Sequence, residues 1–207
     1  MTKITIIDYG VGNFRNVQKA FQAVGAEADI TESVAAVEAA DVLVLPGVGA
    51  FGDAIDNLRQ RGLHQPVLDA VRVGKPLLGI CVGLQLLFDE SEEMGQHRGL
   101  GILPGRVVRF PKTNLPVPHM GWNQIHPQRD HPLLKNIEPG DFAYFAHSYY
   151  ARPASTGDII AHTDYGLDYA SVVGRDNVCA IQFHPEKSQH VGLQILKNFV
   201  DFARRKI

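Results

Sequence analysis

Hydrophobic and polar positions in the first half of the chain alternate between strand-like and helix-like patterns. Residues 4–8 are mainly apolar and typical of a buried strand, and apolar positions then recur at helical spacing over residues 14–24 until Gly25 ends the pattern. The alternation continues and predicts two more strands, at residues 41–45 and 76–81, and three helices, at residues 50–61, 66–73 and 82–91. Because strands that alternate with helices usually form parallel sheets, we expect such a sheet with helices on both faces.

The pattern changes from about Gly105, where short strand-like segments follow one another with only polar breaks between them. These segments are residues 107–110, 120–125, 142–152, 159–163 and 170–173. Residues 174–177 are typical of a hairpin turn into a strand at residues 178–183, and an amphipathic helix over residues 191–205 closes the chain. We therefore expect one α/β domain, residues 1–207, whose mixed, mostly parallel sheet gains antiparallel strands in the C-terminal half.

Residues 111–118 contain three prolines and are predicted to form a loop, because proline cannot donate the hydrogen bonds of a β-ladder. Such a loop can be an ordinary surface connection. It can also be a binding loop, because proline stiffens the backbone before contact and reduces the entropy lost on binding. The sequence leaves both interpretations open.

Composition restricts the classes of function. With 207 residues, 45% of them hydrophobic, the chain can bury one core, and it has no apolar run long enough to span a membrane. Its 20 Lys and Arg against 22 Asp and Glu give a net charge of -2, so we expect no binding to nucleic acid or to membrane surfaces. The N-terminal residues lack the basic start and long apolar region of a secretion signal, which predicts a cytoplasmic protein.

The clearest chemical signal surrounds Cys81, one of two cysteines. An apolar strand leads into Gly79-Ile80-Cys81-Val82-Gly83 and then into a helix, which is the nucleophile-elbow pattern with a thiol in place of a serine hydroxyl. The two glycines permit a tight turn that exposes the side chain, and a helix N-terminus favours the thiolate. A buried structural cysteine would require neither glycine, so we interpret Cys81 as a nucleophile.

A nucleophilic thiol requires a base and a group that orients the base. The segment Gln182-Phe183-His184-Pro185-Glu186 supplies both. If His184 and Glu186 continue a strand in extended geometry, their side chains point to the same side and the carboxylate reaches the imidazole. We expect Pro185 to exclude a helix here. A solvated strand end is the alternative for this motif taken alone.

Residues 47–52 match Gly-x-Gly-x-x-Gly, and Asp69 follows at the spacing of a dinucleotide-binding fingerprint. A dehydrogenase must therefore be considered, although the motif follows a later strand than the first and begins after Pro46. The alternative is a turn, residues 46–49, whose backbone N–H groups bind the oxyanion of a tetrahedral intermediate. We favour the turn because a cysteine nucleophile requires such an oxyanion hole. The nine histidines show no ligand spacing, so we expect neither a metal nor another cofactor.

Three motifs, in this order and at this separation, resemble those of the class I glutamine amidotransferases: Pro46-Gly47-Val48-Gly49, residues 79–85 and His184-Pro185-Glu186. Residues 8–13, 118–123, 144–150 and 185–188 are in turn similar to segments of the glutaminase subunits of imidazole glycerol phosphate synthases. The similarity covers essentially the whole chain, with mild departures at Phe14 and Asn16, where Leu and Ser are expected. It implies the flavodoxin-like α/β fold of that family.

The resemblance also implies residue roles. Cys81 attacks the glutamine amide carbon, His184 protonates the departing ammonia and later activates water, and Glu186 orients the imidazole. Backbone N–H groups of Val48, Gly49 and Val82 form the oxyanion hole. The glutamine-binding residues are Gln85, Ser148 and Tyr149, and the residues at the partner interface or ammonia exit are Asn13, Trp122, Tyr144 and Lys187. Outside this resemblance, the less favoured alternative for Trp122 is a half-buried core residue. Gln85 can be a polar residue of a helix face, and Lys187 a solvated charge.

The implied partner is a cyclase, a (β/α)8 barrel, as the other subunit of a heterodimer with this chain. A barrel takes about 250 residues, which 207 residues cannot include. Three alternatives are left: a glutaminase that serves pyridoxal phosphate, guanylate or anthranilate synthesis, a cysteine peptidase or other hydrolase, and a binding module without turnover.

Overall fold

The computed structural model describes residues 3–112 and 114–206. The strands of the first half are β1 (Lys3–Ile7), β2 (Glu27–Thr31), β3 (Leu43–Gly47), β4 (Leu77–Cys81), β5 (Phe88–Ser91) and β6 (His97–Arg98). Those of the second half are β7 (Leu103–Arg109), β8 (His119–Pro127), β9 (Asp141–His147), β10 (Tyr149–Pro153), β11 (Ile159–Asp164), β12 (Asp168–Arg175) and β13 (Val178–Ile181). The α-helices are α1 (Phe14–Ala23), α2 (Val34–Ala39), α3 (Phe51–Gln60), α4 (His64–Arg72), α5 (Val82–Leu86) and α6 (Gln189–Arg204). Short 3₁₀ helices are η1 (Pro132–Leu134), η2 (Thr156–Asp158) and η3 (Pro185–Lys187).

The described strands form a nine-stranded sheet with the order β2-β1-β3-β4-β13-β12-β11-β8-β9. From β2 to β13 neighbouring strands are parallel, and from β13 to β9 they are antiparallel. The expected parallel sheet with antiparallel additions in the C-terminal half is therefore confirmed. A second, four-stranded sheet has the order β10-β7-β5-β6.

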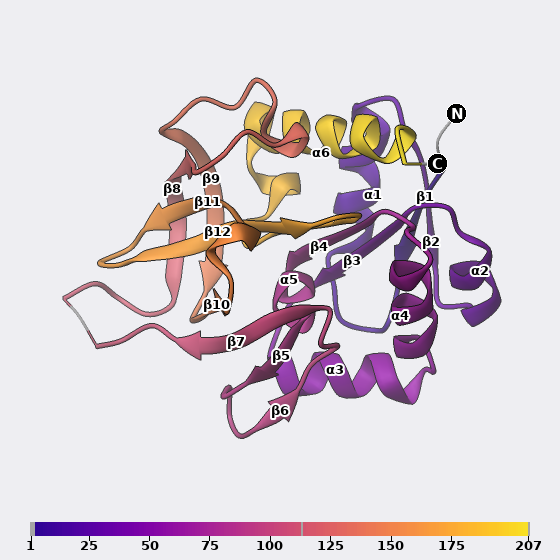
Figure 1. Cartoon of the computed structure of the whole chain (residues 1–207), viewed down its shortest axis with the longest axis horizontal. Coiled ribbons are helices and arrows are strands. Elements are labelled where there is room, and N and C mark those ends of the chain that lie inside the picture. Colours follow the sequence, from indigo (N-terminus) through magenta and orange to yellow (C-terminus); the bar gives the residue numbers. More distant parts are fainter. Residues whose placement is uncertain (1–2, 113, 207) are drawn as a thin grey trace.

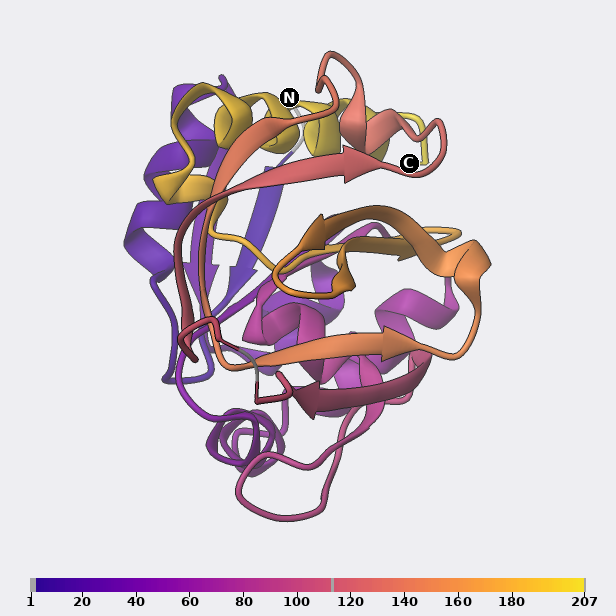
Figure 2. The ribbon, with the colours of Figure 1, turned by 90° about the vertical axis from the view of Figure 1, so that its left-hand side faces the viewer.

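Helices cover both faces of the parallel half of the large sheet. Figure 1 shows α1 and α6 on one side and α3, α4 and α5 on the other, while the small sheet lies beside α3 and α5. The antiparallel strands extend away from the parallel half (Figure 1), and in the view turned by 90° they curve over the small sheet (Figure 2). Between these layers lies one apolar core, which includes the fully buried rings of Phe21, Phe51, Phe145 and Phe199. Burial of such rings supplies the main driving force for folding.

Two predictions about elements were wrong, and three elements were missed. The predicted helix over residues 82–91 ends after Leu86, and Phe88–Ser91 is instead strand β5, paired in parallel with β7. The predicted strand over residues 142–152 is divided at Ser148, because β9 pairs with β8 in the large sheet and β10 with β7 in the small one. The pattern also missed β2, α2 and β6. Within the proline-rich segment, the described residues form a loop as predicted, and Thr113 lies outside the described residues.

Candidate active site

Cys81 lies at the bend between β4 and α5, as the elbow pattern predicts. Its φ is +55°, an unusual value for a residue with a Cβ. Both glycines are required by close contacts: a Cβ on Gly79 would lie 2.8 Å from the Gly83 carbonyl oxygen, and a Cβ on Gly83 would lie 1.7 Å from the Leu45 carbonyl oxygen. Helix α5 can therefore pack against β4 and β3 only without these side chains, and this packing fixes the position of the thiol.

The carboxyl ends of three neighbouring strands bring the distant motifs together. Strand β4 lies between β3 and β13, with Gly47 paired to Cys81 and Ile181 paired to Ile80. His184 follows β13 by three positions and is buried beside Cys81, whose sulfur influences its pKa. Sheets of this kind place functional residues at the carboxyl ends of their parallel strands.

The His184 Nδ1 atom is 3.0 Å from Glu186 Oε1, as expected for a base and its orienting group. The expected local geometry was wrong, however. Glu186 does not continue a strand but lies in the 3₁₀ helix η3, with Pro185 at its first position. Proline is tolerated there because the first residues of a helix have no intrahelical acceptor for their N–H groups. The tight turn, rather than a pleated strand, returns the carboxylate to the imidazole.

The charges of this group favour an ionised pair. Burial alone lowers the pKa of His184, but the Cys81 sulfur and the Glu186 carboxylate reverse this effect and raise that pKa above its ordinary value. For Glu186 burial raises the pKa, and the opposing hydrogen bond and charge of His184, with a hydrogen bond from Asn13, bring it below the ordinary value. The imidazolium and carboxylate are therefore the stable forms of this pair near neutral pH.

A cavity of about 190 Å³ opens beside Cys81 and His184. The predicted residues that line it are Val48, Gly49, Val82, Gln85, Ser148, Tyr149 and Lys187. The structure thus brings together all the residues predicted for the oxyanion hole and for glutamine binding. Its size suits a small polar substrate rather than a peptide or a dinucleotide.

The turn after β3 lies next to the nucleophile. Gly49 has a φ of +86°, which glycine adopts without strain, and it lines the cavity together with Val48. Val82 begins α5, so its backbone N–H has no acceptor within the helix. These positions fit an oxyanion hole. The structure argues against a dinucleotide site at this turn. Asp69, the acidic residue that such a site would use, lies on α4, and its exposed carboxylate is paired with Arg72.

Gln85 has a restricted choice of partners in the cavity. Its Nε2 atom donates to the Tyr149 carbonyl oxygen, at 2.9 Å, and to Gln182 Oε1, at 3.2 Å. An amide nitrogen carries two protons, so both donors are used. Only the Gln85 Oε1 atom is left for a ligand, and Gln85 can therefore bind a ligand's donor group but not its carboxylate.

Glu93 lines the same cavity and was missed by the sequence interpretation. It lies in the loop after β5, and its Oε2 atom accepts a hydrogen bond of 2.7 Å from the backbone N–H of Phe51 at the start of α3. No local sequence pattern predicts that a carboxylate in a loop lines a cavity. It adds a negative charge to the wall of the cavity.

The residues predicted for a partner interface divide into two groups. Trp122 on β8 is 46% exposed, so it is not a core residue, and its ring meets Tyr144 of β9 edge to face at 6.0 Å. The Lys187 Nζ atom lies 5.6 Å from the centre of the Tyr144 ring. Asn13 instead precedes α1 and donates from Nδ2 to Glu186 Oε1 at 3.2 Å. Asn13 is thus in direct contact with the candidate catalytic carboxylate.

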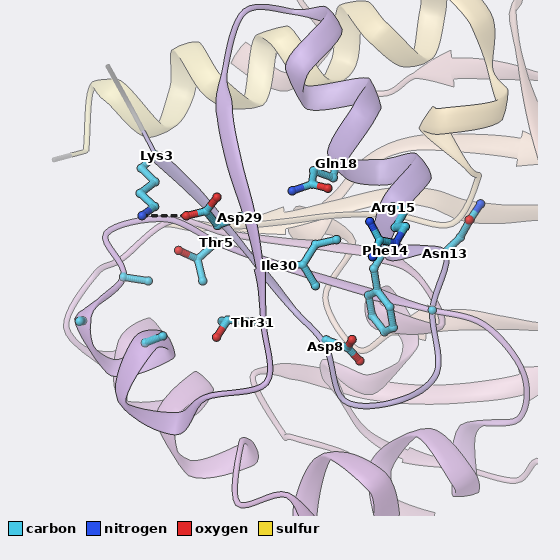
Figure 3. A pocket seen from close by; sticks show the side chains of 14 residues that line it. Lys3, Thr5, Asp8, Asn13, Phe14, Arg15, Gln18, Asp29, Ile30 and Thr31 are labelled. Atoms are coloured by element: carbon cyan, nitrogen blue, oxygen red, sulfur yellow. Dashed lines mark ion pairs between the residues drawn. The ribbon is translucent and has the colours of Figure 1, made fainter.

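A larger hollow, of about 910 Å³, lies along α1 and the edge strand β2, and Asn13 is one of the residues that line it. Figure 3 shows the Lys3–Asp29 ion pair on one side of it and Asn13, Phe14 and Arg15 on the other. Neither Cys81 nor His184 lines it, so it is not the place of the thiol chemistry.

Among the described residues no group of His, Cys, Asp and Glu side chains could hold a metal ion, and none of the described helices has the length and apolar character needed to cross a membrane.

Comparisons with known proteins identify the family. Residues 5–202 match the model of the family described as glutamine amidotransferase class-I. Among curated proteins, the chain is 56% identical over 204 residues to imidazole glycerol phosphate synthase subunit HisH of Syntrophotalea carbinolica, covering 96% of this chain and 99% of the relative. It is 50% identical to the HisH subunit of Methanothermobacter thermautotrophicus, covering 97% of this chain and 99% of that one.

Solved structures agree on the fold. A crystal structure of a glutamine amidotransferase has a TM-score of 0.76 at 21% identity and covers 97% of this chain and 98% of its own. A glutamine amidotransferase of Thermotoga maritima has a TM-score of 0.65 at 14% identity and covers 99% of this chain and 85% of its own. The fold and the sequence together establish that this chain belongs to the class I glutamine amidotransferase family and, within it, to the HisH subunits of imidazole glycerol phosphate synthase.

Proposed function

We propose that this chain hydrolyses glutamine through a thioester on Cys81 and passes the ammonia to a cyclase subunit, which uses it in histidine biosynthesis. The observation that carries the proposal is the buried Cys81, His184 and Glu186 group at the cavity of about 190 Å³. In the overall reaction glutamine and a phosphoribulosyl-formimino ribonucleotide give glutamate, imidazole glycerol phosphate and the aminoimidazole carboxamide ribotide. This chain carries out the first half.

In the proposed mechanism the Cys81 thiolate attacks the amide carbon of glutamine and forms a tetrahedral intermediate. Its oxyanion accepts hydrogen bonds from the backbone N–H groups of Val82 and of the turn at Val48 and Gly49. His184, held protonated beside Glu186, donates its proton to the departing ammonia. The neutral imidazole then takes a proton from water, whose oxygen attacks the thioester carbon, and the C–S bond breaks to release glutamate and restore the thiolate.

Two acceptor groups fit the α-ammonium group of glutamine. The free Oε1 atom of Gln85 and the carboxylate of Glu93 both line the cavity, and neither can bind the α-carboxylate favourably. We assign the α-carboxylate to the backbone and hydroxyl donors at Ser148 and Tyr149. A charge-assisted pair between Glu93 and an ammonium group is stronger than a neutral hydrogen bond.

The partner surface that we propose lies on β8 and β9 and comprises the exposed side chains of Met120, Trp122 and Phe142 with the half-buried ring of Tyr144. Met120, Trp122 and Phe142 are large apolar side chains exposed to solvent, and Lys187 adds a positive charge next to Tyr144. Clusters of exposed aromatic residues are typical of protein interfaces. The partner is a (β/α)8 cyclase, which forms a heterodimer with this chain, and Asn13 lies near the ammonia exit.

The test is glutamine hydrolysis by this chain alone, with the cyclase, and with the cyclase plus its ribonucleotide. We expect slow hydrolysis by the free chain and a large increase in the full complex. We propose as the reason that the turn at residues 46–49 presents its N–H groups to the oxyanion only when the partner is engaged. Cys81→Ala lowers kcat with glutamine by roughly 10⁴-fold or more, whereas ammonium salts still support ribonucleotide conversion in the same complex. Hydrolysis by Cys81→Ala at the wild-type rate contradicts the proposal.

A further inference from the structure

Gln182 is a buried amide next to the candidate nucleophile to which the mechanism gives no task. It directly follows β13, its side chain is 0% exposed, and its Nε2 atom lies 3.8 Å from Cys81 Sγ. Its backbone N–H donates to the Ser171 carbonyl oxygen of β12 at 2.9 Å, which holds the residue in the sheet. A side chain so enclosed has no access to water, so its donors and acceptors must find partners within the protein.

The neighbouring hydrogen bonds fix which end of the Gln182 amide faces the sulfur. The Tyr149 carbonyl oxygen is only an acceptor, so the group of Gln85 that meets it must be the amide nitrogen. The second proton of that nitrogen then points to Gln182, which must present its Oε1 atom in return. Consequently the Gln182 nitrogen, and not its oxygen, faces Cys81.

The opposite orientation of Gln182 would be unfavourable. It would set two NH₂ groups against each other at the Gln85 contact and direct an oxygen lone pair at the lone pairs of the sulfur. Because a backbone carbonyl begins the series, the assignment does not depend on distinguishing nitrogen from oxygen in either side chain. This series of hydrogen bonds links the Tyr149 carbonyl oxygen at the cavity wall, through Gln85 and Gln182, to the sulfur of the nucleophile.

We propose that Gln182 is a positioning residue for the nucleophile, whose amide N–H donates a hydrogen bond to the Cys81 thiolate. The proposal rests on the role of Cys81 as the nucleophile. A hydrogen bond to the charged form of a group stabilises that form over the neutral one. The amide also differs from His184, the other donor near the sulfur, because it cannot transfer its proton. It therefore holds the thiolate without competing for protonation of the ammonia.

The direct test is the rate at which iodoacetamide alkylates Cys81 as a function of pH, followed by peptide mass so that the buried Cys179 is counted separately. Wild type is compared with Gln182→Met, which keeps the length of the side chain and removes the donor. In Gln182→Met we expect the midpoint of the profile to move to higher pH by about one unit, with a rate on the acid side roughly tenfold lower. In the complex, kcat for glutamine falls more than KM rises.

Asn198→Leu is the matched control. Asn198 is also a buried amide, but its Nδ2 atom donates to the carbonyl oxygens of Leu133 and Lys135, away from the cavity. We expect Asn198→Leu to lower the free energy of unfolding, because it removes a buried amide. We expect the pH profile of Cys81 alkylation to be the same as in wild type. If the profiles of Gln182→Met and wild type coincide, the role of Gln182 is overturned while the proposed function stands. If wild-type Cys81 reacts as an ordinary thiol, the nucleophile itself fails, and the role of Gln182 with it.

A measurement without a Gln182 variant covers the case in which Gln182→Met does not fold. The side-chain amide resonances of Gln182 in the wild-type chain are followed by NMR across the same pH range. We expect them to shift with the midpoint of the alkylation profile and to lose this shift in Cys81→Ser. Resonances that do not respond to pH in wild type overturn the proposal.

Discussion

At the scale of single residues, Glu93 provides the sharpest test of substrate binding. If its carboxylate pairs with the α-ammonium group of glutamine, Glu93→Gln removes the charge and keeps the shape. A hydrogen bond to a charged group contributes about 1.5–3 kcal/mol, so we expect KM for glutamine to rise roughly 10- to 100-fold with a smaller change in kcat. Steady-state glutamine hydrolysis by the complex measures both constants.

The adjacent residue provides the control for this substitution. Glu92 does not line the cavity, and its Oε1 atom accepts a hydrogen bond of 3.0 Å from the backbone N–H of Arg109. Glu92→Gln makes the same chemical change one position away, and we expect KM to stay within about twofold of wild type. Equal KM values for the two variants would remove Glu93 from the site.

The residues that sequence alone could find are those whose chemistry requires a local pattern. Cys81 is announced by two glycines at fixed offsets, and His184 and Glu186 by their short segment. No local pattern predicts the roles of Glu93 and Gln182, because each is placed at the site by a residue far away in the sequence. Glu93 contacts Phe51, and Gln182 contacts Gln85. The conformation of the His184 segment was also beyond local reasoning, since proline permits both an extended strand and the first turn of a 3₁₀ helix.

At the scale of elements, the packing of α5 on β3 depends on Gly83. A Cβ at this position would lie 1.7 Å from the Leu45 carbonyl oxygen, which is backbone and cannot rotate away. We expect Gly83→Ala to lower the free energy of unfolding by about 3 kcal/mol, the upper part of the usual range for overpacked interiors, and to displace the thiol. Urea unfolding measures the first effect and the alkylation rate of Cys81 the second.

Gly157→Ala tests whether the effect comes from the close contact rather than from the loss of any glycine. A Cβ at Gly157 would meet its nearest neighbour, Ser155 Oγ, at 3.4 Å, an ordinary contact. This variant should unfold within about 0.5 kcal/mol of wild type. A Gly83→Ala protein as stable as Gly157→Ala would mean that α5 can move from β3 without cost.

Elements were predictable where local pattern and tertiary pairing agree. The parallel strands β1, β3, β4 and β13 and the long helix α6 carry their own periodicity, whereas the pattern missed the edge strand β2. Strand β5 does not, because its sequence continues the apolar spacing of α5, and only pairing with β7 makes it a strand. For the same reason the local sequence does not predict the division between β9 and β10 at Ser148. The division arises because β9 joins the large sheet and β10 joins the small one.

At the scale of the whole molecule, three buried or partly buried histidines that stay neutral determine how the free energy of unfolding responds to acid. Burial lowers the pKa of His119 to about 4, and burial with the charge of Arg129 lowers that of His131 to about 4. Burial also lowers the pKa of His147 to about 3, although a hydrogen bond to the Tyr149 backbone opposes the shift. His119 and His147 are joined through the Tyr169 hydroxyl, at 3.2 Å from each ring.

The sign of the effect follows from the direction of these shifts. In the unfolded chain a histidine has a pKa of about 6.5 and takes up a proton below that pH, whereas these three stay neutral in the folded state. The stability that these three histidines contribute to the folded state is therefore fully present above pH 6.5, and it is lost as the pH falls toward their pKa values in the folded protein. His184 behaves oppositely: its raised pKa means that below pH 6.5 it is protonated in both states and adds nothing to the acid slope.

We therefore expect the free energy of unfolding to fall steeply from pH 6.5 to pH 5, by up to about 1.4 kcal/mol per pH unit for each of the three histidines. His119→Phe keeps an aromatic ring between Phe145 and Tyr165 and removes one titrating group, so its slope over this range should be smaller by up to that amount, whatever its stability at pH 7. Tyr165→Phe changes a ring that stacks on His119 without removing a histidine, and its slope should equal that of wild type. Urea unfolding of the three proteins at half-unit pH steps measures the slopes. A slope for His119→Phe equal to that of wild type would mean that His119 takes up its proton in the folded state as readily as in the unfolded chain.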